Sequence, residues 1–328
     1  QEVIERIQRT QRAAADIGYP VADELTVLQG TVEEGEALVL YGLFEPEAIA
    51  VVVEKGGSRL VRLGPTEEIV ALAKRLPGLD AGTLRGPVRV RPPTGPPRSA
   101  EAIAALREQI LAPLDLGSHV KRVLVSPHGA LAHVPFALLE PSWDLVYVPS
   151  GTTLGFLRRT SRKPGHEVLA LGDVDYTAAG PGRLVSLPHT REEVEQAGDL
   201  VLLGKAATTE GLKTALRTKP RWRAVHLACH GLIEPDRPLF SCLALTPDDG
   251  DDGTLTVLDV LRMDVPADLV VLSACETARG GVYEAEGIIG LTRAFMQAGS
   301  PRVICSLWNV DDAATRCLIC LLYTSPSP

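Results

Sequence analysis

From residue 165 onward the chain alternates continuous apolar runs with segments whose apolar residues recur at helical spacing. The apolar runs are rich in Val, Leu and Ile, which is typical of strands buried on both faces of a sheet. The predicted strands are EVLALGD, LVLLG, RAVHLACHG, FSCLALT, DLVVLSACE and RVICSLW, and the predicted helices are TREEVEQAG, TTEGLKTALRT, a short helix after Leu255, and EGIIGLTRAFMQAG. This alternation predicts a mostly parallel sheet covered by helices on both faces.

The first 160 residues follow a different pattern. EALVLYGL (36–43) and AIAVVVEK (48–55) are followed by Gly56-Gly57 and SRLVRLG, which predicts an antiparallel sheet with a hairpin. The other predicted elements are helices over 2–17, 66–76 and about 99–112, strands over HVKRVLVSP and DLVYVPS, and a loop rich in Pro and Gly over 86–97. We therefore expect a first α/β unit that closes near residue 160.

Size and charge narrow the function classes. The 328 residues are 45% hydrophobic, which is enough for one large α/β domain or two ordinary ones. The net charge of −8, without a dense basic run, argues against a nucleic-acid partner. No apolar stretch reaches the ~18 residues of a membrane span, and the charged amino terminus does not resemble a signal peptide, so we expect a cytoplasmic protein without a membrane partner.

The cysteines indicate reduced thiols. The chain has six, and most lie inside apolar runs, which fits buried thiols better than a disulfide framework. At least one thiol is then free for chemistry.

Two reactive side chains follow predicted strands. RAVHLACHG leads into His230-Gly231, and DLVVLSACE leads into Cys275. Reactive groups of open parallel sheets gather at the carboxyl ends of the strands. An imidazole can activate a thiol as nucleophile and later protonate a leaving amine, which suffices for acyl transfer from a peptide bond. The backbone N–H groups of Gly231 and Cys275 are the candidate oxyanion donors.

Four motifs, in order, carry a family resemblance: HLACHG, LSACETARGG, EGIIGLTRAFMQAG and ICSLWNVDD. They resemble the CHAT family, caspase-like cysteine peptidases often fused to tetratricopeptide repeats and related to caspases and separase. The interval from His230 to Cys275 is close to the roughly 50 residues expected of caspase-type enzymes. LREQILAPL, RVLVSPHGALAHVPFALL and VYVPSGTTL extend the resemblance over about residues 30–315.

The resemblance implies an α/β fold: a caspase-like, mostly parallel sheet flanked by helices, preceded by a smaller, pseudo-caspase-like α/β subdomain. It implies His230 as the base and Cys275 as the nucleophile of a cysteine endopeptidase, with His226 as the strand histidine of the same motif. It also implies a protein substrate, no cofactor, and upstream repeat or sensor modules that regulate the site. Asp311 and Asp312 follow the last strand, where related enzymes build the pocket for the residue before the scissile bond. Trp308, at an apolar strand end, is either a wall of the substrate pocket or a residue of the core, since aromatic residues at strand ends serve both roles.

We expect four segments. They are a helical linker at 1–30, the remnant of an upstream region; an N-terminal α/β subdomain at 31–162; the caspase-like catalytic subdomain at 163–315; and a non-native tail at 316–328. The chain begins at Gln1 without Met, which suggests a missing upstream part. CLLYTSPSP differs in character from the sequence before it and is therefore excluded from the fold prediction.

Three other functions compete with a peptidase. A caspase-like fold can also serve as a catalytically silent interaction module. A metal site of His226, Cys229, His230 and Cys242 is disfavoured because neighbouring residues of a strand face opposite sides. A small-molecule hydrolase would need a nucleophile elbow, and SACET has no flanking glycine.

Overall fold

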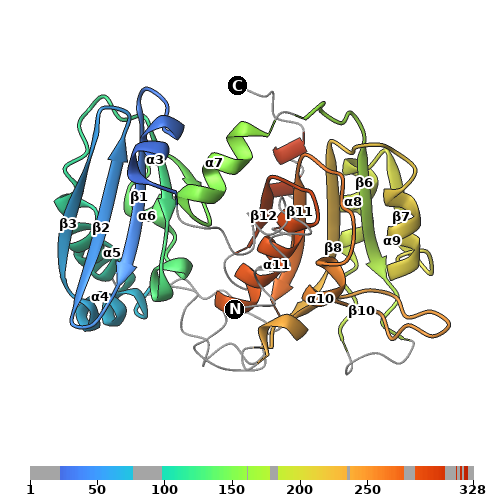
Figure 1. The fold of residues 1–328 in the computed structure, drawn as a ribbon. Coiled ribbons are helices and arrows are strands. Elements are labelled where there is room, and N and C mark those ends of the chain that lie inside the picture. Colours follow the sequence, from blue (N-terminus) through green and yellow to red (C-terminus); the bar gives the residue numbers. More distant parts are fainter. Residues whose placement is uncertain are drawn as a thin grey trace, which may run out of the picture. The chain divides into compact units, whose positions relative to one another are not determined.

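The computed structural model describes residues 23–76, 98–160, 162–177, 184–234, 237–276 and 285–306, together with 315, 318, 319 and 321–323. Within these ranges, the side chains of 98–99, 274–276 and 285–289 are not described. The chain divides into two compact units, Gln1–Ser161 and Arg162–Pro328 (Figure 1). The predicted helix at 2–17 and the predicted loop at 86–97 lie outside the described residues.

The first unit contains a five-stranded sheet in the order β3-β2-β1-β4-β5. The strands β1 (Glu36–Leu43), β2 (Glu47–Glu54) and β3 (Gly57–Pro65) form an antiparallel meander, as predicted. The strands β4 (Arg122–Ser126) and β5 (Asp144–Tyr147) continue the sheet parallel to β1.

Helices cover both faces of this sheet. Alternate residues of β1 divide between two cores: Ala37 and Val39 belong to the larger and Leu38 to the smaller. The larger core includes side chains of α4 (Thr66–Ala73), α5 (Arg98–Ile110) and α6 (Phe136–Leu139), and the smaller one those of α3 (Leu25–Thr31) and α7 (Gly151–Arg159). Burial on both faces explains why β1 is a continuous apolar run. The described residues of this unit also include 3-10 turns at Ala112–Leu114 and Gly129–His133.

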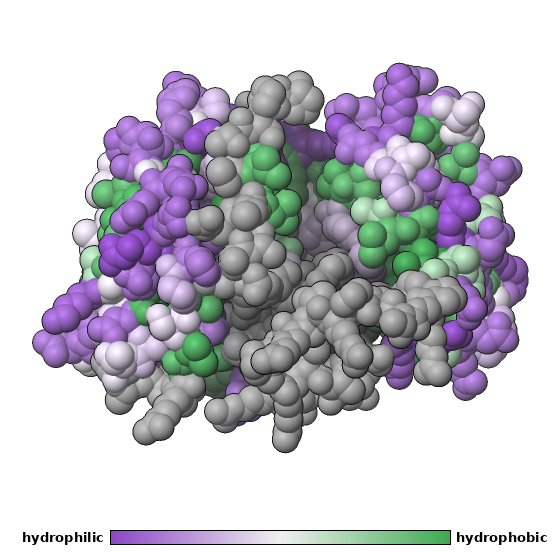
Figure 2. All heavy atoms as spheres, turned by 180° about the vertical axis from the view of Figure 1, so that it is seen from behind, coloured by the Kyte–Doolittle hydropathy of each residue, from purple (hydrophilic) through white to green (hydrophobic). Residues whose placement is uncertain are grey.

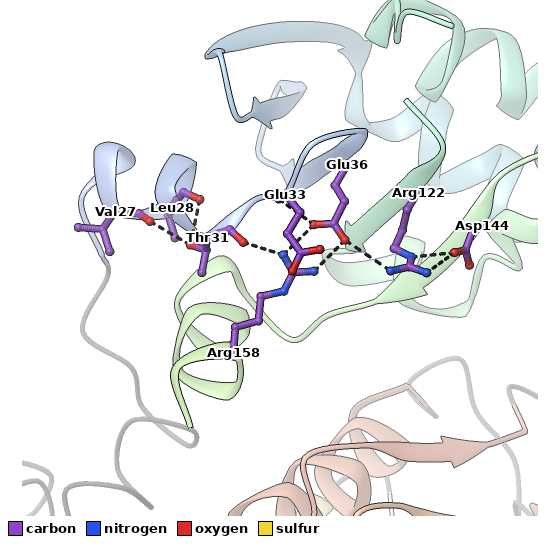
Figure 3. A network of polar contacts seen from close by, with 8 residues as sticks. All are labelled: Val27, Leu28, Thr31, Glu33, Glu36, Arg122, Asp144 and Arg158. Atoms are coloured by element: carbon purple, nitrogen blue, oxygen red, sulfur yellow. Dashed lines mark hydrogen bonds and ion pairs between the residues drawn. The ribbon is translucent and has the colours of Figure 1, made fainter. Parts of the chain in front are cut away.

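A polar network joins α3 and α7 to the start of β1 (Figure 3). The carboxylate of Glu36, only 5% exposed, accepts two hydrogen bonds from the Arg158 guanidinium, at 2.7 and 2.8 Å. Arg158 also donates to the Thr31 carbonyl at 2.6 Å. Arg122 lies 3.7 Å from Glu36 and pairs with Asp144 at 2.7 Å. The bidentate geometry fixes the position of α7 on the sheet.

The second unit contains a seven-stranded sheet with the parallel order β7-β6-β8-β11-β12. Its parallel strands are β6 (Val168–Val174), β7 (Leu200–Gly204), β8 (Ala224–Leu232), β11 (Val270–Glu276) and β12 (Val303–Cys305). The short strands β9 (Cys242–Ala244) and β10 (Thr254–Thr256) are antiparallel, and β9 pairs with the last three residues of β8. The predicted mostly parallel α/β sheet is therefore confirmed.

The described part of the second unit includes the helices α8 (His189–Ala197), α9 (Thr209–Leu216), α10 (Val257–Val260) and α11 (Ala285–Gln297), and a 3-10 turn at Pro238–Phe240. Val225, Leu227 and Cys229 of β8 lie in the large core, which also includes residues of α9, α10 and α11. Ala228, on the other face, packs with Val194 of α8. Both faces of β8 are thus covered, and its carboxyl end carries the candidate chemistry.

The face in Figure 2 is mostly hydrophilic on each unit, with small scattered apolar patches. Among the helices of the described ranges, none combines the length and apolar character needed to span a membrane.

Candidate functional site

The strand β8 holds His230 near its carboxyl end, where the side chain is 4% exposed. The strand continues to Leu232, two residues beyond His230, because β9 pairs with its last residues. His230 and Gly231 therefore lie in the ladder rather than in a following loop. Gly231 is the register partner of Leu243 on β9 and of Glu276 on β11.

The parallel register of β8 and β11 makes Cys275 the direct partner of His230. Register partners on neighbouring strands share one face of a sheet, with backbones about 5 Å apart. Residues distant in the sequence are thus brought together at the backbone level. The Cys275 side chain itself lies outside the described atoms.

A backbone carbonyl holds the His230 imidazole. Its Nε2 lies 2.7 Å from the carbonyl oxygen of Val185. A carbonyl only accepts, so Nε2 carries the proton and donates it. In the neutral ring Nδ1 is then the basic nitrogen, and this atom is buried with no hydrogen-bond partner among the described residues.

Tyr176 supports the same histidine from a second side. Its hydroxyl accepts a hydrogen bond of 3.0 Å from the His230 backbone N–H, and the two rings lie with centroids 5.0 Å apart. Tyr176 follows β6 and Val185 precedes α8, so one connecting region supplies both supports. Neither residue was predicted from the sequence.

Deeper in the unit, His226 forms a buried pair with Glu193 of α8. The His226 Nε2 lies 2.8 Å from Glu193 Oε1, and the two side chains are 0% and 1% exposed. The His226 Nδ1 lies 3.2 Å from the Tyr323 hydroxyl. Burial raises the pKa of Tyr323, so this hydroxyl stays protonated.

The structure gives less information about the other candidate residues for the site. Trp308, Asp311 and Asp312 lie outside the described residues. Burial, with nearby acidic residues, raises the pKa of Cys242 to about 12, so this thiol stays protonated. Cys229 packs in the large core, on the face of β8 opposite His226. Within the described ranges, no three His, Cys, Asp or Glu residues are grouped to hold a metal ion.

The mixed α/β architecture and the strand-end pairing of a histidine with a cysteine are consistent with the caspase-like fold class. The family model of the CHAT domain matches residues 100–326. The chain therefore belongs to the CHAT domain family. The matched range also includes Tyr323 and extends into the segment 316–328.

Two curated relatives are similar to this chain. Tetratricopeptide repeat protein 28 of Homo sapiens is 27% identical over 293 residues, and that of Mus musculus is 28% identical over 298. Each match covers 68% of this chain but only 11% and 12%, respectively, of the relatives' own length. The chain thus matches a small part of much longer proteins named for tetratricopeptide repeats, which is consistent with upstream repeat modules.

Proposed function

We propose that the second unit is a cysteine endopeptidase domain that hydrolyses peptide bonds in partner proteins. Cys275 is the nucleophile and His230 the general base and acid. The observation that carries the proposal is the register of β8 and β11, which pairs these two residues across neighbouring strands. The orientation of the imidazole by Val185 supports the same roles.

The acyl-transfer sequence follows from the histidine tautomer. His230 Nδ1 takes the thiol proton of Cys275, and the thiolate attacks the carbonyl carbon of the scissile bond. The N–H groups of Gly231 and Cys275 stabilise the oxyanion. The imidazolium, whose Nε2–H donates to the Val185 carbonyl, protonates the leaving amine as the C–N bond breaks, which leaves a thioester. Water, deprotonated by His230, then cleaves the thioester and restores the thiol.

The substrate contacts belong to the same proposal. Trp308, Asp311 and Asp312 follow β12 in the sequence, and β12 is the neighbour of β11. The carboxylates of Asp311 and Asp312 would select a basic side chain before the scissile bond, and Trp308 would form a wall of the pocket for that side chain. Upstream repeats of the kind named in the relatives would control access of protein substrates.

The test compares the wild-type chain with Cys275→Ala, using a peptide library and a thiol-directed acyloxymethylketone probe. We expect the probe to label the wild type and not the variant, and only the wild type to cleave peptides. A library enriched in Lys or Arg tests the acidic pocket, and Asp311→Asn with Asp312→Asn should remove that preference. Equal labelling of both chains would exclude Cys275 as the nucleophile.

A catalytically silent interaction module is the second candidate. It is favoured by the names of the curated relatives, which refer to repeats and to no activity. In that case a folded wild-type chain would resist the probe and leave every peptide intact. Since an interaction module needs no activated thiol, labelling of Cys275 separates the two functions.

A further inference from the structure

We infer that Glu193 and His226 are positioning residues for the reaction proposed above: their buried pair locks α8 onto β8 and thereby holds the Val185 carbonyl that orients His230. The inference rests on the proposed function of His230. It adds two residues to which the proposed reaction assigns no chemical step and no substrate contact.

Most buried side chains between α8 and the sheet are apolar, so hydrophobic packing alone does not explain the presence of Glu193 and His226 there. The neighbouring buried side chains are apolar and small: Ala170, Val194 and Ala228. The carboxyl group of Glu193 is buried beside them, and its Oε2 has no hydrogen-bond partner among the described residues. Burying such a group costs more than an apolar contact of similar volume, whereas its hydrogen bond to His226 has one defined geometry. The pair thus favours a defined position over maximal stability.

Contacts along the chain connect this pair to the His230 support. Val185 lies four residues before the start of α8. In the first turn of the helix, the Thr190 hydroxyl donates to the Leu187 carbonyl at 2.7 Å and accepts from the Asp173 N–H at 3.0 Å. Arg191 pairs with the Asp173 carboxylate. The helix is therefore fixed to β6 at its start and to β8 through Glu193, and Val185 follows its position.

The helix also has little space to shift toward the sheet. A Cβ at Gly172 of β6 would lie 2.9 Å from Val194 and 3.0 Å from the Thr190 carbonyl oxygen. A Cβ at Gly198, just after the helix, would lie 2.7 Å from the Ala170 side chain. Loss of the hydrogen bond between Glu193 and His226 would let α8 move outward, and the Val185 carbonyl would move with it. A shift of about 1 Å in the acceptor that orients a catalytic imidazole can lower the rate by up to about 100-fold.

The experiment measures Cys275 directly. Iodoacetamide alkylation near pH ~6.5, where an ordinary thiol is only about 1% thiolate, is followed for the Cys275 peptide by mass spectrometry. In Glu193→Leu we expect alkylation to slow roughly tenfold, and kcat on a library-derived peptide to fall about 10- to 100-fold with KM unchanged, because no substrate contact is removed. Glu193→Gln keeps an oxygen that accepts from His226 and should stay within about threefold of wild type.

Two further variants serve as a control and as an alternative test. Glu36→Leu removes a similarly buried carboxylate from the first unit, and it should lower stability without slowing Cys275 alkylation. If Glu193→Leu does not fold, Thr190→Val tests the same helix with a nearly isosteric change and should slow alkylation to a smaller extent. Folded Glu193→Leu or Thr190→Val with wild-type alkylation and kcat would overturn the positioning role. If wild-type Cys275 itself reacts like an ordinary thiol, the dyad is absent and the proposed function falls with the inference.

Discussion

At the scale of single residues, the imidazole of His230 is held by groups that bear no reactive chemistry. Val185 contributes only its backbone carbonyl, and its side chain is 76% exposed. Tyr176 contributes a ring that packs at a tilt against the imidazole and a hydroxyl that accepts a hydrogen bond from the backbone N–H of His230. The first contact sets the tautomer, and the second satisfies a donor that would otherwise be buried without a partner.

Tyr176→Phe separates these two contributions. The ring remains, but the His230 N–H loses its acceptor, so the free energy of unfolding should fall by about 1–2 kcal/mol. We expect kcat to fall only a few-fold, since Val185 still orients the imidazole, whereas Tyr176→Leu should reduce it further. Urea unfolding and peptide turnover measure both effects. A Tyr176→Phe chain as stable as wild type would mean that water replaces the hydroxyl.

The sequence predicts His230 and Cys275 as a pair because a histidine and a cysteine at strand ends are chemically specific, and the register of β8 and β11 places their backbones side by side. It did not identify Val185, because any residue type can supply a carbonyl. Val185 and Tyr176 lie 45 and 54 positions before His230, and their contacts with it are long-range. Tertiary contacts of this kind, such as the hydrogen bond between Asp173 and Thr190, follow no periodic pattern in the sequence.

At the scale of elements, the strands were easier to predict than the helices. Residues of β8 are buried on both faces, and apart from His226 and His230 the strand is apolar or glycine in the sequence. In contrast, α7 was not predicted although Ser150 caps it, with its side chain accepting from the Thr153 N–H. Its short, mixed sequence GTTLGFLRR has little helical periodicity. The antiparallel direction of β9 also could not be read from FSCLALT, because a strand's neighbours are chosen by the fold.

The tight contact between α8 and β6 gives an element-scale prediction. Gly172→Ala would place a methyl group against Val194 and the Thr190 carbonyl, so we expect a loss of about 1–3 kcal/mol in the unfolding free energy. Gly290→Ala, in α11 of the same unit, is the matched control. Its nearest contacts are at 3.8 Å, and the helix gains up to about 1 kcal/mol from alanine. Thermal unfolding of the two variants compares them, and equal stability would show that α8 can shift without cost.

At the scale of the whole molecule, the chain is built from two units with separate cores. The first contains the network around Glu36 and the second the proposed dyad. Because different polar groups stabilise the two units, their responses to pH should differ. Burial alone would raise the pKa of Glu36, but hydrogen bonds from Arg158 and the Glu33 N–H, with the charges of Arg158 and Arg122, outweigh it and lower the pKa.

The sign of the pH effect follows from that lowered pKa. The unfolded chain binds a proton near the usual value of 4.5, before the folded state does, so the contribution of Glu36 is complete at neutral pH and declines as the pH falls below 4.5. Glu36→Gln should therefore destabilise the first unit by about 1–3 kcal/mol at neutral pH, and by progressively less as the pH falls below 4.5.

Trp143 reports on the first unit, since it packs against that unit's core. The fluorescence of Trp143 is obtained by subtracting the denaturant-unfolding curve of a Trp143→Phe variant from the curve of the same chain with Trp143 present. The prediction requires that Glu36→Gln shift this transition at neutral pH and leave the remaining signal, from Trp222 and Trp308 of the second unit, unchanged. An equal shift of both signals would instead mean that the two units unfold as one cooperative body, and the stability of the dyad would then depend on a carboxylate in the other unit.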